Sequence, residues 1–304
     1  MNKKTQKFTV ATTCAGCPIG LIIRTVLNAT DDNIVVANAT GCMEVTSTIY
    51  PNTAWNVPYI HSAFGNTGAT ISGIETAYRS LKKQNKLRTG KPVKFVAFGG
   101  DGGTYDIGLQ ALSGALERGH DFLYICYDNG AYMNTGNQRS GATPIGADTE
   151  TTPSGKKSYG KRTRRKDMMS IVAAHHIPYV ATANVGFLQD FEDKVKKAFE
   201  MKGPKFILVF SPCVVGWKYE PSQTIDIAKQ ATETNFWPLF EIENGRYYLN
   251  YEPKNKLPIE EFYKTQGRFK HIFRRQNKDE ILGKVQEEVD NQWKKLQDLT
   301  KLNE

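Results

Sequence analysis

Short apolar runs alternate along the chain with longer stretches in which apolar residues recur at helical spacing. The runs cover residues 33–38, 93–98, 122–127, 178–183 and 206–210, and each is apolar almost throughout, as strands buried on both faces of a parallel sheet are. Helices are predicted over residues 18–29, 67–83, 106–118, 189–202 and 222–234. This alternation predicts an α/β fold, with a parallel sheet, right-handed crossovers and helices on both faces.

The C-terminal part of the chain has a different pattern. Over residues 279–300 the apolar side chains fall on one stripe of a long, otherwise polar helix. They are Ile281, Leu282, Val285, Val289, Trp293, Leu296 and Leu299. We favour packing of this stripe on the chain's own core or on a partner subunit over a membrane-surface role. The chain therefore divides into a domain over residues 1–250 and a helical extension over residues 251–304, which we expect to pack against a subunit.

Composition and charge narrow the class of protein. With 39% hydrophobic and 23% charged residues, the 304-residue chain has an ordinary globular balance. No run approaches the roughly 18 apolar residues of a spanning helix, and residues 1–11 lack the apolar segment of a secretory signal, so we expect a cytoplasmic protein. The net charge of +9 is concentrated in Lys3, Lys4, Lys7 and residues 156–166. This positive charge is compatible with an anionic cofactor, an acidic protein or nucleic acid as a partner.

Four unusual segments follow directly after predicted strands. They are residues 41–42, 99–103, 128–130 and 211–213. In open parallel sheets, ligands bind beyond the carboxyl ends of the strands. We therefore expect these segments to converge on one site.

Four of the five cysteines indicate thiolate chemistry. Cys14 and Cys17 form a C-x-x-C pair, whereas Cys42 and Cys213 are single and each lies at a predicted strand end. Without a signal peptide, a disulfide scaffold is disfavoured. Structural zinc usually takes two C-x-x-C pairs in a compact module, so this arrangement favours a four-thiolate iron–sulfur cluster, with zinc as the alternative. Cys126 lies inside a predicted strand and is expected to be a core residue.

The glycine-rich segment around Gly100-Asp101-Gly102 offers exposed backbone amides and one carboxylate ahead of a helix. Such a turn can cradle a phosphate while the acid holds the divalent ion that bridges it. It is not a P-loop, because no Gly-Lys-Ser/Thr follows. Asp128-Asn129 at the adjacent strand end supplies a further ligand with a side-chain amide. This pairing is typical of a magnesium–diphosphate site for thiamine diphosphate.

Taken in order, the motifs resemble those of the β subunits of the 2-oxoacid:ferredoxin oxidoreductases, pyruvate:ferredoxin oxidoreductase in particular. The resemblance covers residues 14–245 and is far more specific than any single motif. The motifs are Cys-Ala-Gly-Cys at 14–17, Gly-Cys-Met-Glu-Val at 41–45, Gly-Asp-Gly-Gly-Thr-Tyr-Asp-Ile-Gly at 100–108, Tyr-Asp-Asn-Gly-Ala-Tyr-Met-Asn-Thr-Gly at 127–136 and Ala-Thr-Pro-Ile-Gly-Ala at 142–147. Pro18 and Ile19 depart from the family pattern, outside the ligand set.

The resemblance implies a role for individual residues. One [4Fe–4S] cluster would be held by Cys14, Cys17, Cys42 and Cys213, and Mg²⁺ by Asp101, the Asn129 side chain and the Ala131 carbonyl. The implied thiamine diphosphate contacts are Gly41, Cys42, Gly100, Asp101, Gly102, Gly103, Asn129, Gly130, Ala131, Tyr132, Met133 and Asn134. Asn134 would also lie beside the reacting centre as a catalytic residue. His61 is the second catalytic candidate, although a lone histidine is more often structural.

The implied activity is the reversible oxidative decarboxylation of pyruvate to acetyl-CoA and CO₂, with electrons passing through the cluster to ferredoxin. Thiamine enzymes need a glutamate to activate the aminopyrimidine, and by resemblance it belongs to a separate α subunit of a heterotetramer. The γ and δ subunits would carry further clusters, so this chain alone is expected to be inactive. The basic run at 161–166 is read as a solvated loop, or as a contact for another subunit, coenzyme A phosphates or an acidic ferredoxin.

Two alternatives remain. A branched-chain 2-oxoacid:ferredoxin oxidoreductase has a similar β subunit, because the partner builds part of the substrate pocket. From a different class, the chain could be a zinc-stabilised, basic nucleic-acid-binding protein. That reading leaves the Gly-Asp-Gly and Asp-Asn elements without a role and finds no nucleic-acid module in the sequence. We therefore expect neither nucleic acid nor a membrane among the partners.

Overall fold

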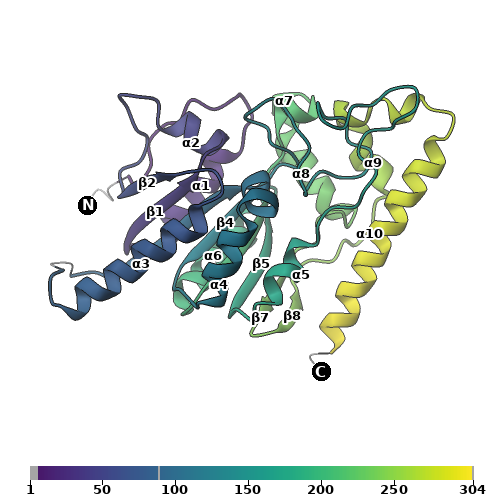
Figure 1. The fold of residues 1–304 in the computed structure, drawn as a ribbon. Coiled ribbons are helices and arrows are strands. Elements are labelled where there is room, and N and C mark those ends of the chain that lie inside the picture. The colour runs from purple at the N-terminus through teal and green to yellow at the C-terminus, as the bar shows by residue number, and fades with distance from the viewer. Residues whose placement is uncertain (1–5, 88–89, 303–304) are drawn as a thin grey trace.

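A mostly parallel sheet of eight strands forms the centre of the molecule (Figure 1). The computed structural model describes residues 6–87 and 90–302, so Lys3 and Lys4 lie outside the described residues. The strands follow the order β2-β1-β3-β4-β6-β5-β7-β8. Their bounds are β1 Asn33–Ala39, β2 Tyr59–Ser62, β3 Val93–Gly100, β4 Leu123–Asp128, β5 Tyr179–Asn184, β6 Lys205–Phe210, β7 Phe240–Glu243 and β8 Arg246–Leu249.

Helices cover both faces of this sheet. In Figure 1, α3, α4 and α5 lie in front of the strands, whereas α1 and α6 lie behind them. The α-helices are α1 Ile19–Asn28, α2 Cys42–Ser47, α3 Thr67–Lys83, α4 Leu109–Glu117, α5 Met168–Ala173, α6 Leu188–Glu200, α7 Val214–Trp217, α8 Thr224–Glu233, α9 Ile259–Lys264 and α10 Lys278–Lys301. A π-helix, η1 Gly102–Ile107, and the 3₁₀ turns η2 Pro221–Gln223, η3 Gly267–Phe269 and η4 Ile272–Arg274 complete the elements.

The predicted strands and major helices are confirmed to within a few residues. Three predictions need correction. The sheet is not wholly parallel, because β7 runs antiparallel to β5 and β8 antiparallel to β7. β2 and this β7–β8 pair were missed, since they are short and interrupt their apolar residues with polar ones. The helix predicted from Asp106 begins instead as the π-helix η1, and α4 starts at Leu109.

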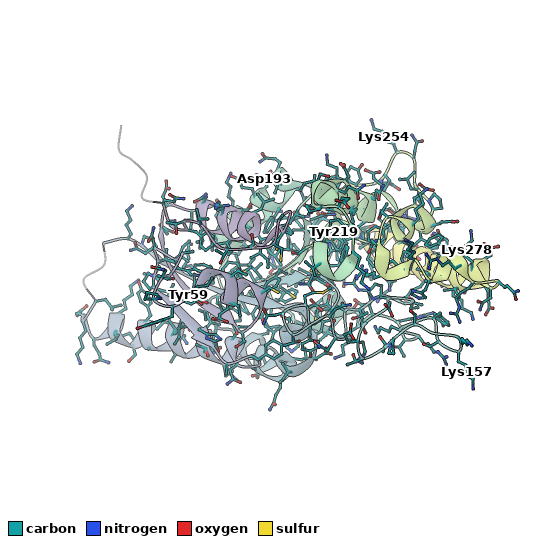
Figure 2. All side chains as sticks on the ribbon, turned by 90° about the horizontal axis from the view of Figure 1, so that it is seen from above. Tyr59, Lys157, Asp193, Tyr219, Lys254 and Lys278 are labelled. Atoms are coloured by element: carbon teal, nitrogen blue, oxygen red, sulfur yellow. The ribbon has the colours of Figure 1, made fainter. Side chains whose placement is uncertain are left out.

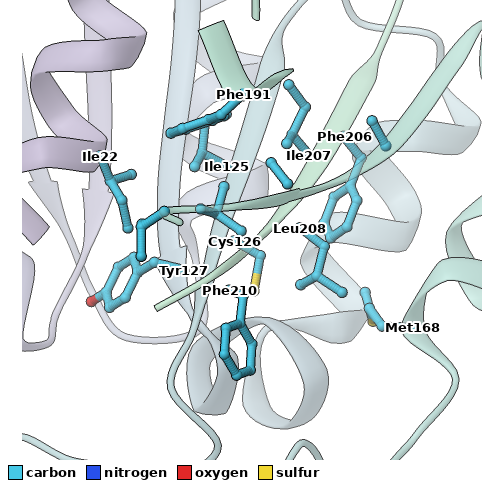
Figure 3. Close-up of a cluster of buried hydrophobic side chains, with 14 of the residues drawn as sticks. Ile22, Ile125, Cys126, Tyr127, Met168, Phe191, Phe206, Ile207, Leu208 and Phe210 are labelled. Atoms are coloured by element: carbon cyan, nitrogen blue, oxygen red, sulfur yellow. The ribbon is translucent and has the colours of Figure 1, made fainter. Parts of the chain in front are cut away.

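The core lies on both sides of β4 and β6. Both strands are buried at every position, which accounts for their uninterrupted apolar sequences. Figure 3 shows Ile125, Cys126 and Tyr127 of β4 among Ile207 and Phe210 of β6. Cys126 has no exposed surface, which confirms its prediction as a core residue.

The long helix α10 closes one end of the molecule, next to α9 and β8 (Figure 1). Its apolar stripe is buried from Ile281 through Leu296. The stripe therefore packs on the chain's own core, one of the two expected arrangements. Among the described residues, no helix combines the length and the hydropathy that crossing a bilayer requires.

The strand register aligns the ends from which the predicted site segments emerge. Asn38 of β1 pairs with Phe98 of β3, and Gly100 of β3 pairs with Tyr127 of β4. Asp128, the last residue of β4, pairs with Phe210, the last of β6. The four segments that follow these strands consequently emerge along one edge of the sheet.

Candidate functional site

A cavity of about 230 Å³ lies at this carboxyl edge. Its lining residues come from the segments that follow β1, β3 and β4, together with Phe64 after β2. They are Thr40, Gly41, Cys42, Phe64, Gly100, Asp101, Gly102, Gly103, Tyr127, Asn129, Ala131, Tyr132, Met133, Asn134 and Thr135. The structure thus brings together every predicted cofactor contact except Gly130, whose N–H donates to Asp128 Oδ1 instead (3.0 Å).

Three oxygen ligands can meet at one point in this cavity. One terminal atom of the Asn129 amide lies 3.0 Å from Asp101 Oδ1 and 2.8 Å from the Ala131 carbonyl oxygen. With the amide nitrogen in that position, the group donates to both oxygens. With the amide oxygen there, three acceptors face one another, an arrangement that a bound cation would satisfy. The donor set is the carboxylate, amide and carbonyl oxygen chemistry that Mg²⁺ prefers, so these residues fit the ion.

Asp101, one of these three oxygen ligands, is buried. Its Oδ2 accepts a hydrogen bond from the Ser140 hydroxyl (2.5 Å), and its Oδ1 accepts one from the Asn129 backbone N–H (3.3 Å). Burial, followed by the nearby Asp128 carboxylate, raises the pKa of Asp101 well above its usual range. A divalent cation would supply the positive charge that keeps Asp101 ionised. Ser140 was not singled out from sequence, because it lies 39 positions away in a long loop.

The glycine-rich segment enters η1 directly at Gly102. A Cβ at Gly102 would lie 2.5 Å from the Tyr132 ring, so no larger residue fits without displacing that ring. Asp106 does not begin a helix as predicted. Its Oδ2 instead accepts hydrogen bonds from the Gly141 N–H (2.8 Å) and the Tyr132 hydroxyl (3.2 Å). The close approach of backbone to ring leaves the Gly100–Gly103 amides beside the cavity.

The four predicted cluster cysteines are neighbours at the same edge. Burial is the main cause that raises the pKa of Cys17 to about 11 and of Cys42 to about 12, and the charge of the other cysteines adds to it. The same causes raise the pKa of Cys213, whereas Cys14 is exposed. Within the described part of the chain, no three His, Cys, Asp or Glu side chains are arranged as a metal site. The role of the four cysteines as cluster ligands stays a prediction.

Local packing places the C-x-x-C loop against the segment after Cys213. Gly16 has a positive φ of 74°, and a Cβ there would lie 2.5 Å from the Pro221 carbonyl oxygen. The Thr224 hydroxyl donates to the Gly16 carbonyl (2.8 Å). Glycine is required because a side chain would be strained by the backbone and would meet Pro221. This contact joins Cys14 and Cys17 to a segment about 200 residues away.

Two contacts connect the cysteines to the cavity. Cys42 is itself a lining residue. Trp217, four residues after Cys213, donates its indole N–H to the Asn129 backbone carbonyl (2.7 Å). Sequence analysis did not identify Trp217, because nothing local to it indicates a partner 88 positions away.

The two predicted catalytic residues differ in position. Asn134 lines the cavity and is exposed at its mouth. His61 is not among the lining residues; its Nε2 contacts the Thr40 hydroxyl (2.7 Å) and its Nδ1 lies 3.6 Å from Glu44 Oε1. Thr40 does line the cavity, so His61 contacts a lining residue but does not itself line the cavity. Sequence analysis missed four lining residues: Thr40, Phe64, Tyr127 and Thr135.

Comparison with known proteins identifies the family. Residues 39–209 match the family described as thiamine pyrophosphate enzyme, C-terminal TPP binding domain. The chain is 51% identical to the pyruvate synthase subunit PorB of Thermotoga maritima, over 93% of this chain and 88% of that protein. It is 50% identical to PorB of Methanocaldococcus jannaschii, over 93% of both chains. The chain belongs to the PorB family.

Two further proteins with other substrates in their names are also similar to this PorB-family chain. It is 46% identical to the ketoisovalerate oxidoreductase subunit VorB of Pyrococcus abyssi, over 97% of this chain and 93% of that protein. A solved 2-oxoglutarate:ferredoxin oxidoreductase from Magnetococcus marinus shares the fold, with a TM-score of 0.59 at 21% identity, covering 75% of this chain and 81% of that one. The predicted resemblance, the thiamine diphosphate fold and the oxidoreductase class are confirmed. The zinc-stabilised nucleic-acid-binding alternative has no counterpart among these relatives.

Proposed function

We propose that this chain is the β subunit of a pyruvate:ferredoxin oxidoreductase that binds Mg²⁺–thiamine diphosphate in the 230 Å³ cavity and one [4Fe–4S] cluster beside it. The observation that carries the proposal is the oxygen corner formed by Asp101, Asn129 and Ala131 inside a cavity that Cys42 also lines. Two relatives that are about half identical to the chain are pyruvate synthase subunits. The proposal is supported by the position of the residues that the resemblance implies, which lie around this cavity.

Each part of the cavity has a distinct task in this proposal. The oxygen corner would hold Mg²⁺, and the Gly102 and Gly103 amides would face the diphosphate at the start of η1. Apolar walls from Phe64 and Met133 would exclude water around the ring. Thiamine diphosphate supplies, when bound, the nucleophilic carbon and the electron sink that decarboxylation of a 2-oxoacid requires. A cluster at Cys42 would place the first electron acceptor in the wall of the same cavity.

The cavity is incomplete in one respect that makes partner subunits part of the proposal. Among the described lining residues, Asp101 is the only carboxylate, and it belongs to the metal corner. By the family resemblance, we assign the glutamate that activates the aminopyrimidine to an α subunit. The γ and δ subunits, ferredoxin and coenzyme A complete the proposed set of partners.

Metal content tests the cluster assignment. The chain, purified with its partners without oxygen, is compared with Cys42→Ala and Cys126→Ala. We expect Cys42→Ala to lose about four irons and four sulfides, the content of one cubane. Cys126→Ala, which removes a core thiol away from the cavity, should keep them. Zinc in place of iron and sulfide, or full iron in Cys42→Ala, would contradict the cluster assignment.

The branched-chain alternative is kept because VorB is nearly as similar to this chain as PorB. Initial rates of ferredoxin reduction with pyruvate, 2-oxoisovalerate and 2-oxoglutarate decide between the substrates. We expect the highest kcat/KM for pyruvate. A higher value for 2-oxoisovalerate would reassign the substrate and leave the cofactor site unchanged.

A further inference from the structure

Arg165 leaves the basic stretch 156–166 and enters the core. Its side chain is only 16% exposed, and its guanidinium lies 5.3 Å from the Phe236 ring centre and 5.0 Å from that of Trp237. Neighbouring Arg164 is 71% exposed, and Lys157 extends from the surface near α10 (Figure 2). The reading of residues 161–166 as a solvated loop is therefore wrong at Arg165, which is buried with a specific partner, and at Lys161, which is 3% exposed.

That partner is Asp128, the last residue of β4. Arg165 Nη2 donates to Asp128 Oδ2 at 2.6 Å, and the carboxylate is 1% exposed. Oδ2 also accepts a hydrogen bond from the Tyr105 hydroxyl of η1 (2.8 Å), whereas Oδ1 accepts the Gly130 N–H (3.0 Å). The two residues that flank Gly130 are Asn129 and Ala131, which form the oxygen corner. One carboxylate thus ties the metal-ligand turn to the glycine-rich π-helix.

Lys166 makes a second connection from the same segment. Its Nζ donates to the Tyr105 carbonyl oxygen and to Asp106 Oδ1, both at 2.6 Å. Asp106 in turn accepts the hydroxyl hydrogen bond from Tyr132, the ring that packs on Gly102. The turn that carries Asn129 and Ala131 and the glycine-rich π-helix η1 are consequently held by two consecutive basic residues.

Charge explains why Arg165 has to be a cation. The Asp128 carboxylate is 1% exposed, and a carboxylate buried to that extent needs a cationic partner. Arg165 is the cation in direct contact with Asp128. Removing it leaves a buried carboxylate whose remaining partners, the Tyr105 hydroxyl and the Gly130 N–H, are neutral, and such a group moves or takes up water. Either of these changes would release the Gly130 N–H and shift the turn.

We propose that Arg165 is a positioning residue of the cofactor site: by pairing with Asp128 it fixes the turn that presents Asn129 and Ala131 to magnesium. The inference rests on the proposed function, because the ligand it serves is Mg²⁺–thiamine diphosphate. Arg165 is not among the described residues that line the cavity. Its contribution is to lock the two loops in the arrangement that binds them.

The test is a double-mutant cycle on cofactor binding by the enzyme assembled with its partner subunits and stripped of cofactor. Dissociation constants for Mg²⁺–thiamine diphosphate are measured by calorimetry for wild type, Arg165→Met, Asp128→Asn and the double variant. Arg165→Met should bind about tenfold more weakly or worse, as loss of an outer partner of a metal ligand does. In Asp128→Asn/Arg165→Met, which buries no unpaired charge, the second change should add little to Asp128→Asn.

Arg164→Met is the matched control, since it removes the same charge one residue away from an exposed side chain. It should bind as wild type does, and melting temperatures report folding of every variant. If Arg165→Met alone does not fold, the double variant still decides, because it should bind as Asp128→Asn does. Wild-type affinity in Arg165→Met, or additive effects in the cycle, overturns the inference. Absence of binding by wild type would instead refute the proposed function.

Discussion

At the scale of single residues, the chain order of strands and strand ends predicted which residues meet. Gly41, Asp101 and Asn129 could be placed together because each follows a buried apolar run, and parallel strands end at one edge. Ser140 and Trp217 could not be predicted, since each reaches the site from a distant segment whose local sequence gives no indication of the contact. Arg165 was misjudged for a related reason: its neighbours are exposed, and burial is decided by Phe236 and Trp237, some 70 positions on.

Gly102→Ala tests how closely the cavity is built. The added Cβ would lie 2.5 Å from the Tyr132 ring, so either the ring or the start of η1 must move. We expect Mg²⁺–thiamine diphosphate affinity to fall on the order of tenfold or more, because displacements near 1 Å at such sites are costly. Calorimetry on the assembled enzyme measures it.

Gly73→Ala provides the control for that substitution. Gly73 is exposed within α3, and a Cβ there meets nothing within 4 Å. It should leave cofactor affinity unchanged and stabilise the chain by about 1 kcal/mol, through helix propensity alone. Equal cofactor affinities of the two glycine variants would show that the Tyr132 ring can move aside without weakening cofactor binding.

At the scale of elements, uniform burial made β4 and β6 predictable, whereas strands that combine buried and exposed residues were not predicted. β2 and the β7–β8 pair lie at sheet edges and carry charged or polar residues within four-residue strands. The π-helix η1 has no periodic signature in six residues. Such helices occur mostly at functional sites, where one extra backbone position changes the direction of a segment. Of these poorly predicted elements, η1 supplies lining residues of the cavity, Gly102 and Gly103, whereas β2, β7 and β8 supply none.

Asp167→Ala tests the start of α5. The Asp167 carboxylate caps this helix through the Ser170 N–H (3.1 Å) and also contacts Lys295 of α10 (3.1 Å). Burial alone would raise the pKa of Asp167, but hydrogen bonds from Ser170 and Lys295 outweigh it and lower the pKa below the usual 3.8. We expect the variant to lose about 1 kcal/mol of unfolding free energy at pH 7.

The sign of the pH dependence follows from that lowered pKa. The folded state binds this proton less readily than the unfolded state, so the stabilisation is present above pH 3.8 and disappears as the pH falls through the folded pKa. Urea unfolding at pH 7 and pH 3 should therefore show wild type and Asp167→Ala converging at the lower pH. A constant difference would mean that the carboxylate charge is irrelevant to the cap.

At the scale of the whole molecule, the predicted cofactor residues, from several strand ends, lie around one cavity. The α/β class and the long C-terminal helix were predictable from hydrophobic period alone. That α10 buries its stripe within its own chain could not be predicted, because an amphipathic helix looks the same whichever surface covers it. Subunit packing by residues 251–304 remains a prediction.

The isolated chain should have no 2-oxoacid-dependent ferredoxin reduction. The reason is that Asp101, already engaged at the metal corner, is the only carboxylate among the described lining residues. An anaerobic assay compares the chain alone with the chain assembled with its partners. Turnover by the chain alone would show that it contains its own activating base.

Val285→Asp tests whether α10 is held by its apolar stripe. Val285 is 3% exposed beneath the helix, and burying an unpaired charge there should cost about 3 kcal/mol or more. The helix should detach and become sensitive to limited proteolysis. Asn291→Asp, which places the same side chain at an exposed position of α10, should remain resistant. Equal resistance of both variants would indicate that α10 is fastened by its polar contacts instead.

The place of Cys42 has a consequence for how the enzyme matures. Its thiol belongs to the cysteine group and also forms part of the cavity wall, so a bound thiamine diphosphate would cover it. Under the proposed function, iron and sulfide would have to be delivered before the organic cofactor. Oxygen damage to a finished enzyme would accordingly be hard to repair in place, since the vitamin-derived cofactor has to leave before the inorganic one can be rebuilt.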